Sequence, residues 1–271
     1  MSQTAIDNFQ KTVWDYFATS KRDLPWRIPR PDGSFDAYHV VVSELMLQQT
    51  QVARVMPKYE AFIKAFPEIT NLAKAPLSDV LKLWSGLGYN RRAKYLWQTA
   101  KLLEKKPQPW SYETLRDCPG IGPNTAGAII VYAYNYPRLF IETNVRSVFI
   151  HHFFKDTNGV DDKAILPLLD QALNGQDPRT FYWALMDYGT HLKSTYGNTA
   201  RRSKHYTTQT AFAGSTRQLR GRIIKLLTER QYQQTELSEQ LADPRTQTVL
   251  AALQREGLIS KRGKSYHLTY S

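Results

Sequence analysis

The chain has 271 residues, of which 42% are hydrophobic and 12% aromatic, enough apolar material for one large or two modest folded domains. Lysine and arginine number 36 against 24 acidic residues, and this net charge of +12 favours a polyanion, above all nucleic acid, as the partner. The only cysteine, Cys118, excludes an internal disulfide, a zinc ribbon and an iron–sulfur cluster held by cysteines of this chain.

The first three quarters of the chain predict a succession of helices. Apolar residues recur with helical spacing in 41–55 and 80–84, and prolines and glycines separate the segments. The longest apolar run, 126–134, is far shorter than the ~18 residues needed to span a bilayer, and the N-terminus has no signal-peptide pattern. We therefore expect an all-α domain over 1–214, in a cytoplasmic protein without membrane association.

A different pattern follows over 215–271. Two apolar helical stripes are separated by a short helix that we expect Thr235 to cap, and two short strands then flank the basic turn 261–264. Three helices followed by a basic hairpin predict a winged-helix module. Its third helix, which begins at Arg245, would enter a DNA groove. Packing on the first domain, or binding to a protein, is the alternative.

The run 115–129 contains a glycine-rich connection between two predicted helices. Ser111 is expected to cap the first helix, and Pro123 to open the second. The connection itself is Gly120, Ile121 and Gly122. Glycines allow close approach of the backbone, and N–H groups at a helix N-terminus suit a phosphate. The segment resembles a helix-hairpin-helix motif and predicts contact with the DNA backbone, whereas an ordinary helix turn is the alternative.

Three further segments are candidates for chemistry. In 43–52, helical spacing would place Glu44, Gln48 and Gln51 on one face, where a poorly solvated carboxylate has a raised pKa and suits an acid. A solvated polar stripe is the alternative there. In 83–94, Tyr89 stands beside glycines and cations. This pattern predicts a ring that stacks on bases next to phosphate contacts such as Arg91. A solvated basic turn at the start of a helix is the alternative.

The third candidate segment is 140–148, where Glu142 follows an apolar pair and precedes Thr-Asn. Glu142 would cap a helix that starts near Val145, a structural role compatible with catalysis.

Together these segments resemble the helix-hairpin-helix DNA glycosylase superfamily, and within it the A/G-specific adenine DNA glycosylases. The similarity runs from about Asp23 to Gly189, and the run Ser-Glu-Leu-Met-Leu-Gln-Gln-Thr-Gln-Val is specific to the adenine branch. The resemblance implies a two-lobed helical fold with DNA between the lobes. One lobe would be a barrel of about 30–139, and the other would combine 1–29 with 140–212.

The resemblance also implies roles for individual residues. Glu44 matches the catalytic acid, Glu142 stands where the family has an aspartate that stabilises the cationic sugar, and Asn144 would position the nucleophile or the carboxylate. The residues that match the lining of the base pocket are Trp26, Arg27, Asn124 and Asp187. Those that match contacts to DNA, including the probes of the opposite base, are Gln48, Gln49, Thr50, Tyr89 and the hairpin glycines.

The chain departs from the family in several places. Asn124 replaces the lysine nucleophile of bifunctional members, so we expect hydrolysis without strand cleavage. Thr143 stands where the adenine branch has glycine. The four cysteines that would follow Gly189 are absent, and we expect a basic loop with Arg201 and Arg202 to meet phosphate instead. A winged helix stands where the adenine branch has its 8-oxoguanine reader domain.

These features predict a monomeric, monofunctional DNA glycosylase that acts on double-stranded DNA with no metal or cofactor. The expected reaction is removal of adenine mispaired with guanine or 8-oxoguanine. One alternative is the same fold acting on thymine or uracil opposite guanine, or on hypoxanthine. Another is a DNA-binding lesion sensor without catalysis.

Overall fold

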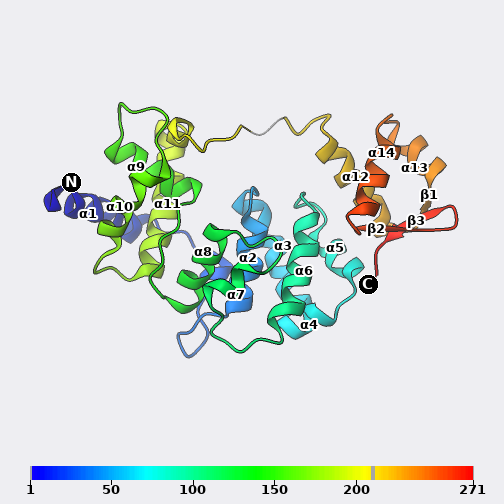
Figure 1. The fold of residues 1–271 in the computed structure, drawn as a ribbon, viewed down its shortest axis with the longest axis horizontal. Coiled ribbons are helices and arrows are strands. Elements are labelled where there is room, and N and C mark those ends of the chain that lie inside the picture. The colour runs from blue at the N-terminus through cyan, green and yellow to red at the C-terminus, as the bar shows by residue number, and fades with distance from the viewer. Residues whose placement is uncertain (1, 209–210, 271) are drawn as a thin grey trace. The chain divides into compact units, whose positions relative to one another are not determined.

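The computed structural model describes residues 2–208 and 211–270 and is dominated by helices (Figure 1). The chain divides into two compact units, Met1–Ala37 with Gly122–Thr208, and Tyr38–Ile121 with Gln209–Ser271. This division differs from the expected lobes, because 30–37 and the helix after the hairpin group with the N-terminus. The terminal module groups with 38–121. No helix in the described ranges combines the length and hydropathy required for a membrane crossing.

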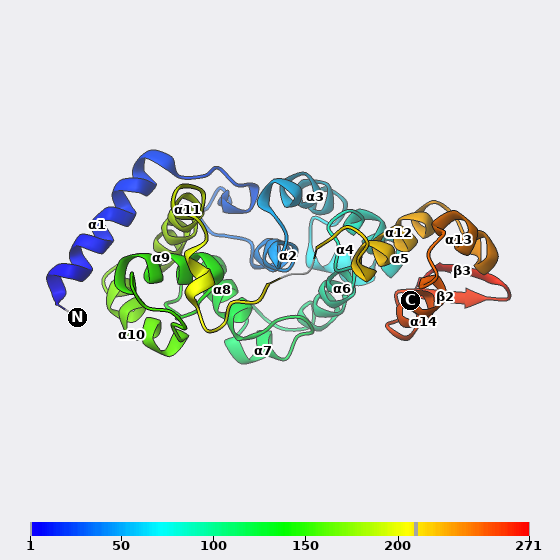
Figure 2. The same ribbon diagram turned by 90° about the horizontal axis from the view of Figure 1, so that it is seen from above.

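The first unit packs around α11. Its elements are α1 (Gln3–Ser20), η1 (Pro25–Arg27), α8 (Pro123–Tyr134), α9 (Thr143–Phe153), α10 (Asp162–Leu173), α11 (Pro178–Tyr196) and η2 (Thr199–Arg202). Helices α1 and α9 both lie against α11 (Figure 2). The ring of Phe9 on α1 lies 5.0 Å from that of Phe149 and 5.1 Å from that of Phe153, so aromatic side chains join α1 to α9.

Helix α8 belongs to this unit because of the segment that follows it. The ring of Phe140 stacks on that of Tyr182 in α11, with centroids 4.0 Å apart. The Tyr182 hydroxyl accepts the Phe140 N–H at 3.0 Å and donates to the Arg138 carbonyl at 3.1 Å. A Cβ on Gly127 would meet the Cβ of Phe140 at 3.1 Å, so α8 packs closely against the same ring.

The second unit contains the remaining helices of the first 213 residues. They are α2 (Ala37–Leu47), α3 (Val52–Ala65), α4 (Ile69–Lys74), α5 (Leu77–Trp84), α6 (Arg91–Leu103) and α7 (Tyr112–Arg116). Their core is built from fully buried side chains that include Leu45, Phe62 and Trp84. The apolar spacing seen in the sequence thus corresponds to the buried faces of α2, α3 and α5.

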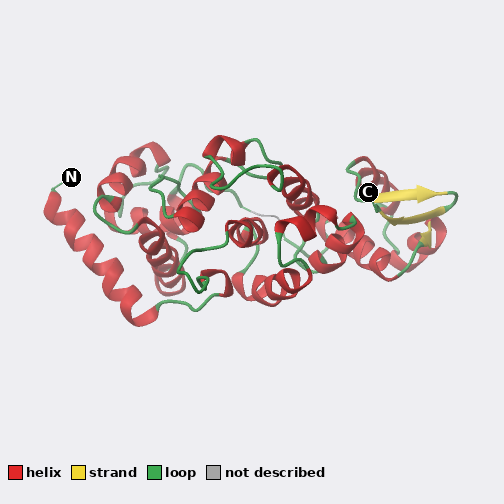
Figure 3. Cartoon of the chain, turned by 90° about the horizontal axis from the view of Figure 1, so that it is seen from below, coloured by secondary structure: helices red, strands yellow, loops and turns green. Residues whose placement is uncertain are grey.

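The terminal module has the element order of a winged helix. Its elements are α12 (Thr216–Glu229), β1 (Tyr232–Gln233), α13 (Gln234–Leu241), α14 (Thr246–Arg255), β2 (Ile259–Arg262) and β3 (Ser265–Leu268). The strands form an antiparallel sheet in the order β1-β3-β2, drawn in yellow in Figure 3. The predicted cap at Thr235 is wrong, because Gln233 caps α13 in a reciprocal pair with Glu236.

The module packs on the helices of its unit. Helix α12 and strand β3 lie against α5, and the Leu77 N–H donates to the Tyr270 carbonyl at 3.3 Å. The Lys94 ammonium of α6 donates to the Glu256 carbonyl at 2.6 Å. The packing weighed as an alternative function of the module is therefore present. One face of α14 and the turn between β2 and β3 stay exposed.

Candidate active site and DNA contacts

The glycine hairpin has the structure that its sequence predicts. Ser111 caps α7 by accepting the Thr114 N–H at 3.1 Å, and α8 opens at Pro123. Gly120 has a φ of +78°, and a Cβ there would meet the ring of Tyr95 at 2.9 Å. Only glycine meets both conditions without strain. The hairpin is held from outside as well, because the Gln48 amide donates to the Gly120 carbonyl at 3.1 Å.

Helix α2 carries Glu44 at a half-buried position between the buried Ser43 and Leu45. The prediction that Gln51 shares its helical face is wrong, because α2 ends at Leu47 and Gln51 is the N-cap of α3. The turn between the two helices contains an exposed Gln49 with a φ of +55°. Gln48 therefore holds the hairpin, and Gln49 is the amide that faces outward.

A buried arginine fixes this turn. The Arg92 guanidinium donates to the carbonyls of Leu45 at 2.8 Å and Met46 at 3.1 Å, and also to that of Gln48. These are carbonyls that the end of α2 leaves without helical partners, so the cation satisfies them and opposes the negative end of the helix dipole. Burial lowers the pKa of Arg92 to about 10, and the residue stays charged at neutral pH.

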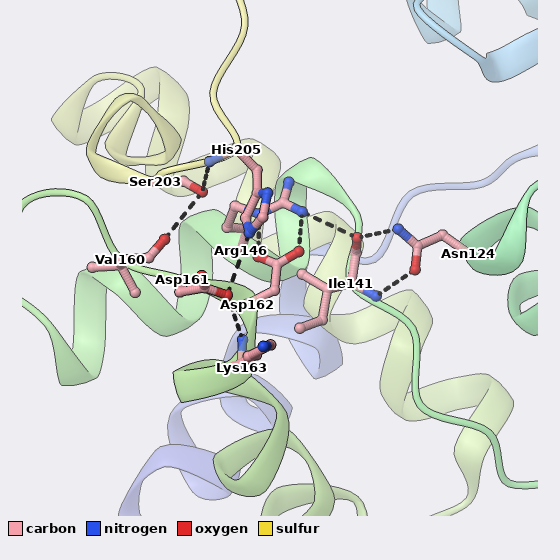
Figure 4. Close-up of polar contacts among 9 residues, drawn as sticks. All are labelled: Asn124, Ile141, Arg146, Val160, Asp161, Asp162, Lys163, Ser203 and His205. Carbon is pink, nitrogen blue, oxygen red and sulfur yellow. Dashed lines mark hydrogen bonds and ion pairs between the residues drawn. The ribbon is translucent and has the colours of Figure 1, made fainter.

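Glu142 occupies the N-cap position of α9, but the predicted cap is wrong, because its side chain makes no cap hydrogen bond to that helix. The peptide that precedes it is fixed from two sides (Figure 4). The Asn124 amide donates to the Ile141 carbonyl at 2.9 Å, and Arg146 reaches the same oxygen at 3.5 Å. Arg146 is also paired with Asp162 at 2.6 Å. Burial raises the pKa of Glu142 to about 7 against the opposing charge of Arg146. This carboxyl is thus poised to change its protonation state near neutral pH.

Asn144 lies on the first turn of α9, where α11 comes closest. A Cβ on Gly189 of α11 would lie 2.8 Å from both the Cβ and the carbonyl oxygen of Asn144. The glycine that ends the Leu-Met-Asp-Tyr-Gly segment therefore permits this close approach. Any larger residue there would displace the turn that carries Asn144.

Asp187, two residues earlier, has a side chain without solvent exposure and is clamped by two arginines. Arg27 donates to both of its carboxylate oxygens at 2.8 Å, and the Arg22 side chain donates at 2.6 Å. Burial alone would raise the pKa of Asp187, but the hydrogen bonds from Arg27 and the arginine charges lower it. Arg27 also lies 5.3 Å from the ring centre of Trp183. The clamp fixes η1, which carries the half-buried Trp26.

Tyr89 and Arg91 lie at the start of α6 in the second unit. Tyr89 has a φ of +47°, and its hydroxyl accepts a hydrogen bond of 2.5 Å from Arg217 of α12. Arg91 pairs with Glu256 at 2.7 Å. Thr50, in the turn before α3, accepts from Arg92 at 2.9 Å. Gln49 and Tyr89 thus line one cavity, and Thr50 is bonded to Arg92, another residue of its wall.

The other predicted DNA cations are placed differently from one another. Arg201 is exposed on η2. Arg202 instead points inward and donates to the Phe154 carbonyl at 2.8 Å, at the end of α9. Arg245 is held by Asp243 through two side-chain bonds of 2.9 and 2.6 Å. Only Arg201 of these three is directed to solvent without such a clamp in the described structure.

Comparison with known proteins decides the family. Residues 42–169 match the HhH-GPD model, described as a superfamily of base excision DNA repair proteins. An adenine DNA glycosylase of Mycolicibacterium smegmatis is 31% identical over 237 residues, which is 78% of each chain. The chain belongs to the HhH-GPD superfamily. The fold expected from the helix-hairpin-helix resemblance is therefore confirmed.

Other known proteins are similar to a smaller part of this chain. The adenine DNA glycosylase of Buchnera aphidicola subsp. Baizongia pistaciae is 37% identical over 189 residues, covering 67% of this chain and 52% of the relative. This chain thus spans about half the length of that relative. A thermostable thymine-DNA glycosylase has a similar fold, with a TM-score of 0.59 at 24% identity over 69% of this chain and 86% of its own. An endonuclease III–DNA complex also scores 0.59, at 15% identity over 72% and 89%.

The four-cysteine cluster of other HhH-GPD members does not fit this chain. Cys118 is its only cysteine; it is buried, its thiol donates to the Thr114 carbonyl at 3.3 Å, and burial raises its pKa to about 11. Within 2–208 and 211–270, no three metal-binding side chains gather closely enough to hold an ion. The loop after α11 is instead held by Arg202 and by Lys204, whose backbone N–H donates to the Val160 carbonyl at 2.9 Å.

Sequence reasoning missed the arginines that organise the site. Arg92, Arg146 and Arg22 each hold a segment that carries a predicted site residue. Arg92 stood in the sequence as one of a basic pair with Arg91. The available signal was its i, i+4 spacing to the buried Leu96, but Arg91 has the same spacing to the half-buried Tyr95, so the two arginines were not separated.

Proposed function

We propose that this protein is a monofunctional DNA glycosylase that removes adenine mispaired with guanine or 8-oxoguanine from double-stranded DNA. The single observation that carries the proposal is α2 with its following turn, where a half-buried Glu44 precedes a glutamine–threonine turn fixed by Arg92. The relatives named adenine DNA glycosylase support the choice of base. The net charge of +12 supports DNA as partner.

The reaction requires one acid and one stabilising anion. Glu44 donates a proton to a ring nitrogen of adenine while the bond from the sugar C1′ to the base breaks, and the bonding electrons leave with the base. Glu142, ionised, stabilises the cationic sugar; at ~4 Å and an effective dielectric of about 20 the attraction is on the order of 4 kcal/mol. Water then adds to C1′ and gives its proton to Glu44. Asn144 positions the water or the carboxylate.

The absence of strand cleavage follows from Asn124. A strand-cleaving member forms a Schiff base with an amine, and the amide of Asn124 cannot form one. Its side chain is used instead to hold the Ile141 backbone, with the amide donating at 2.9 Å. The products are therefore free adenine and an intact strand with an abasic site.

The DNA contacts are distributed over both compact units. Backbone amides at the hairpin bind phosphate, together with Arg201 and Arg91. Gln49, Thr50 and Tyr89 contact the base opposite the extruded adenine. Trp26 and the Arg27–Asp187 clamp line the pocket for that adenine. Extrusion costs a few kcal/mol, which is smallest at a mispair.

The test is a panel of duplexes, each with one mispair. We expect alkali-labile sites from adenine opposite guanine and opposite 8-oxoguanine, and no strand breaks before alkali. Release of thymine, uracil or hypoxanthine in place of adenine would assign the fold to another base. Binding without release of any base would make the protein a lesion sensor.

A further inference from the structure

A cavity of about 510 Å³ lies within the second unit, between the start of α6 and α12. Its volume falls in the ~300–1,000 Å³ range typical of ligand pockets. The walls include Gln48, Gln49, Tyr89 and four arginines, against the single carboxylate of Glu256. The cavity therefore suits an electron-rich, planar ligand with hydrogen-bond acceptors on its edge. The terminal module supplies one side of it.

Two residues of the wall have a strained backbone. Gln49 and Tyr89 have φ values of +55° and +47°, a conformation that costs a non-glycine residue about 1–2 kcal/mol. One buried side chain maintains both turns. Arg92 donates to Thr50 Oγ1 at 2.9 Å in the first turn and to the Gly88 carbonyl at 3.4 Å in the second. Strain sustained in this way is typical of positions where function fixes the geometry.

Arg217 of α12 is the cation directed at these turns. It donates to the Tyr89 hydroxyl at 2.5 Å, and its guanidinium carbon lies 5.2 Å from the centre of the Tyr89 ring. Its neighbour Arg220 is used differently, because it pairs with Glu256 at 2.5 Å, as Arg91 does at 2.7 Å. Glu256 thus pairs with Arg220 inside the module and fastens the module to α6 through Arg91. Arg217 instead contacts the ring predicted to meet DNA.

From this arrangement we infer that the cavity receives the base opposite the excised adenine, and that Arg217 reads it as a guanine. The inference rests on the proposed function. A guanidinium fork donates two parallel hydrogen bonds to O6 and N7 of guanine, which are both acceptors. In the free protein the Tyr89 hydroxyl accepts the N–H that O6 would accept. The winged-helix module thus takes part in recognising the opposite strand.

This chemistry separates guanine from 8-oxoguanine. In 8-oxoguanine N7 carries a hydrogen and donates, so the adjacent acceptor pair O6 and N7 that matches the Arg217 fork is lost, and a donor faces one of its N–H groups. A bidentate pair discriminates by about 1–3 kcal/mol, which corresponds to roughly 5- to 150-fold. Adenine opposite guanine is therefore the better substrate of this protein.

The experiment measures single-turnover excision of adenine opposite guanine, 8-oxoguanine and 7-deazaguanine, which has a carbon in place of N7. We expect the full-length protein to act on the guanine duplex at least about 5-fold faster than on the other two. Arg217→Ala and Arg217→Lys should bring the three rates within about twofold of one another. Arg222→Ala, on the same helix but donating to Leu241 within the module at 3.5 Å, should keep the preference.

Equal excision rates opposite guanine and opposite 7-deazaguanine in the unmodified protein would overturn the inference. This comparison needs no variant, so it does not depend on whether a variant folds. A preference retained in Arg217→Ala would also overturn it. Failure of the proposed function is distinguished by a binding assay with a tetrahydrofuran abasic analogue opposite the same three bases. Tighter binding opposite guanine in the absence of excision would uphold the guanine site and reject the glycosylase activity.

Discussion

Glu44 lies within a helix, whereas Glu142 lies immediately before one, and a different arginine in each compact unit holds the backbone beside these residues. Near Glu44, Arg92 is buried and donates to backbone carbonyls at the end of α2. Near Glu142, Arg146 is shared between the Ile141 carbonyl and Asp162. The first arginine stabilises backbone geometry. The second adjusts charge, because the positive charge of Arg146 lowers the pKa of Glu142 against the effect of burial.

The largest expected effect is on Glu44. Glu44→Gln keeps the shape of α2 but removes the proton donor, so excision of adenine should fall by about 10²–10⁴-fold. Binding to a mispaired duplex should change little, because the phosphate contacts are untouched. Single-turnover excision and a filter-binding assay on the same duplex check both. An excision rate within tenfold of that of the unmodified protein would show that another residue is the proton donor.

Substitution of Arg92 tests whether its hydrogen bonds to backbone carbonyls stabilise the end of α2. Arg92→Met leaves several buried carbonyls without a donor, at about 1–3 kcal/mol for each group left unsatisfied, so we expect the free energy of unfolding to fall by about 3 kcal/mol. Arg91→Met is the matched control, because its side chain is 53% exposed in a salt bridge, which is worth about 0–1 kcal/mol. Urea denaturation measures both. Equal losses would contradict the assignment of Arg92 as the clamp.

These two adjacent arginines also show the limit of what the sequence predicted. Local signals were sufficient for the Ser111 cap, the Pro123 helix start and the hairpin between them, because each depends on residues within one turn. The sequence could not separate Arg91 from Arg92, because one step of helical phase decides which of them is buried. The carbonyls of Leu45 and Gln48 that Arg92 contacts lie more than 40 residues away.

Misplaced features have the same physical origin. Helical spacing put Gln51 on the face of Glu44, but α2 ends earlier, where Arg92 satisfies its carbonyls from another helix. Arg202 belonged to a basic run that predicted phosphate contacts, yet its guanidinium donates to the end of α9. The sequence shows the positive charges of Arg92 and Arg202 but not which way their side chains point. Whether a cation faces solvent or backbone depends on tertiary packing.

Gly189 in the first unit sets how closely α11 approaches Asn144, so its substitution tests whether this close packing matters for stability and excision. Gly189→Ala places a Cβ 2.8 Å from Asn144 atoms, and we expect a loss of stability of about 1–3 kcal/mol together with slower excision. Gly221→Ala is the control: it lies within α12, its Cβ would meet open space, and helix propensity should stabilise by about 0.5–1 kcal/mol. Thermal unfolding should therefore shift in opposite directions.

The smallest expected effect is the pH dependence of stability that comes from the ionisation of Glu142. The pKa of Glu142 is raised to about 7 in the folded protein, above its ordinary value of 4.5, so folding favours the protonated carboxyl. That contribution is fully present below pH 4.5 and is lost as pH rises through about 7. Relative to Glu142→Gln, which stays neutral, the unmodified protein should lose on the order of 1 kcal/mol between pH 5 and 8, a value reduced by solvent screening.

Asp162→Asn then separates charge from geometry. The amide can still accept a hydrogen bond from Arg146, but it no longer offsets the arginine charge, so the pKa of Glu142 should fall and the pH-dependent loss of stability should move to lower pH. If Glu142 must be ionised to stabilise the sugar cation, the rising limb of excision rate against pH should move in the same direction. A shift in stability without a shift in the rate profile would show that the ionisation of Glu142 affects folding and not excision. A shift in both would make Asp162, through Arg146, the residue that sets when the site is active.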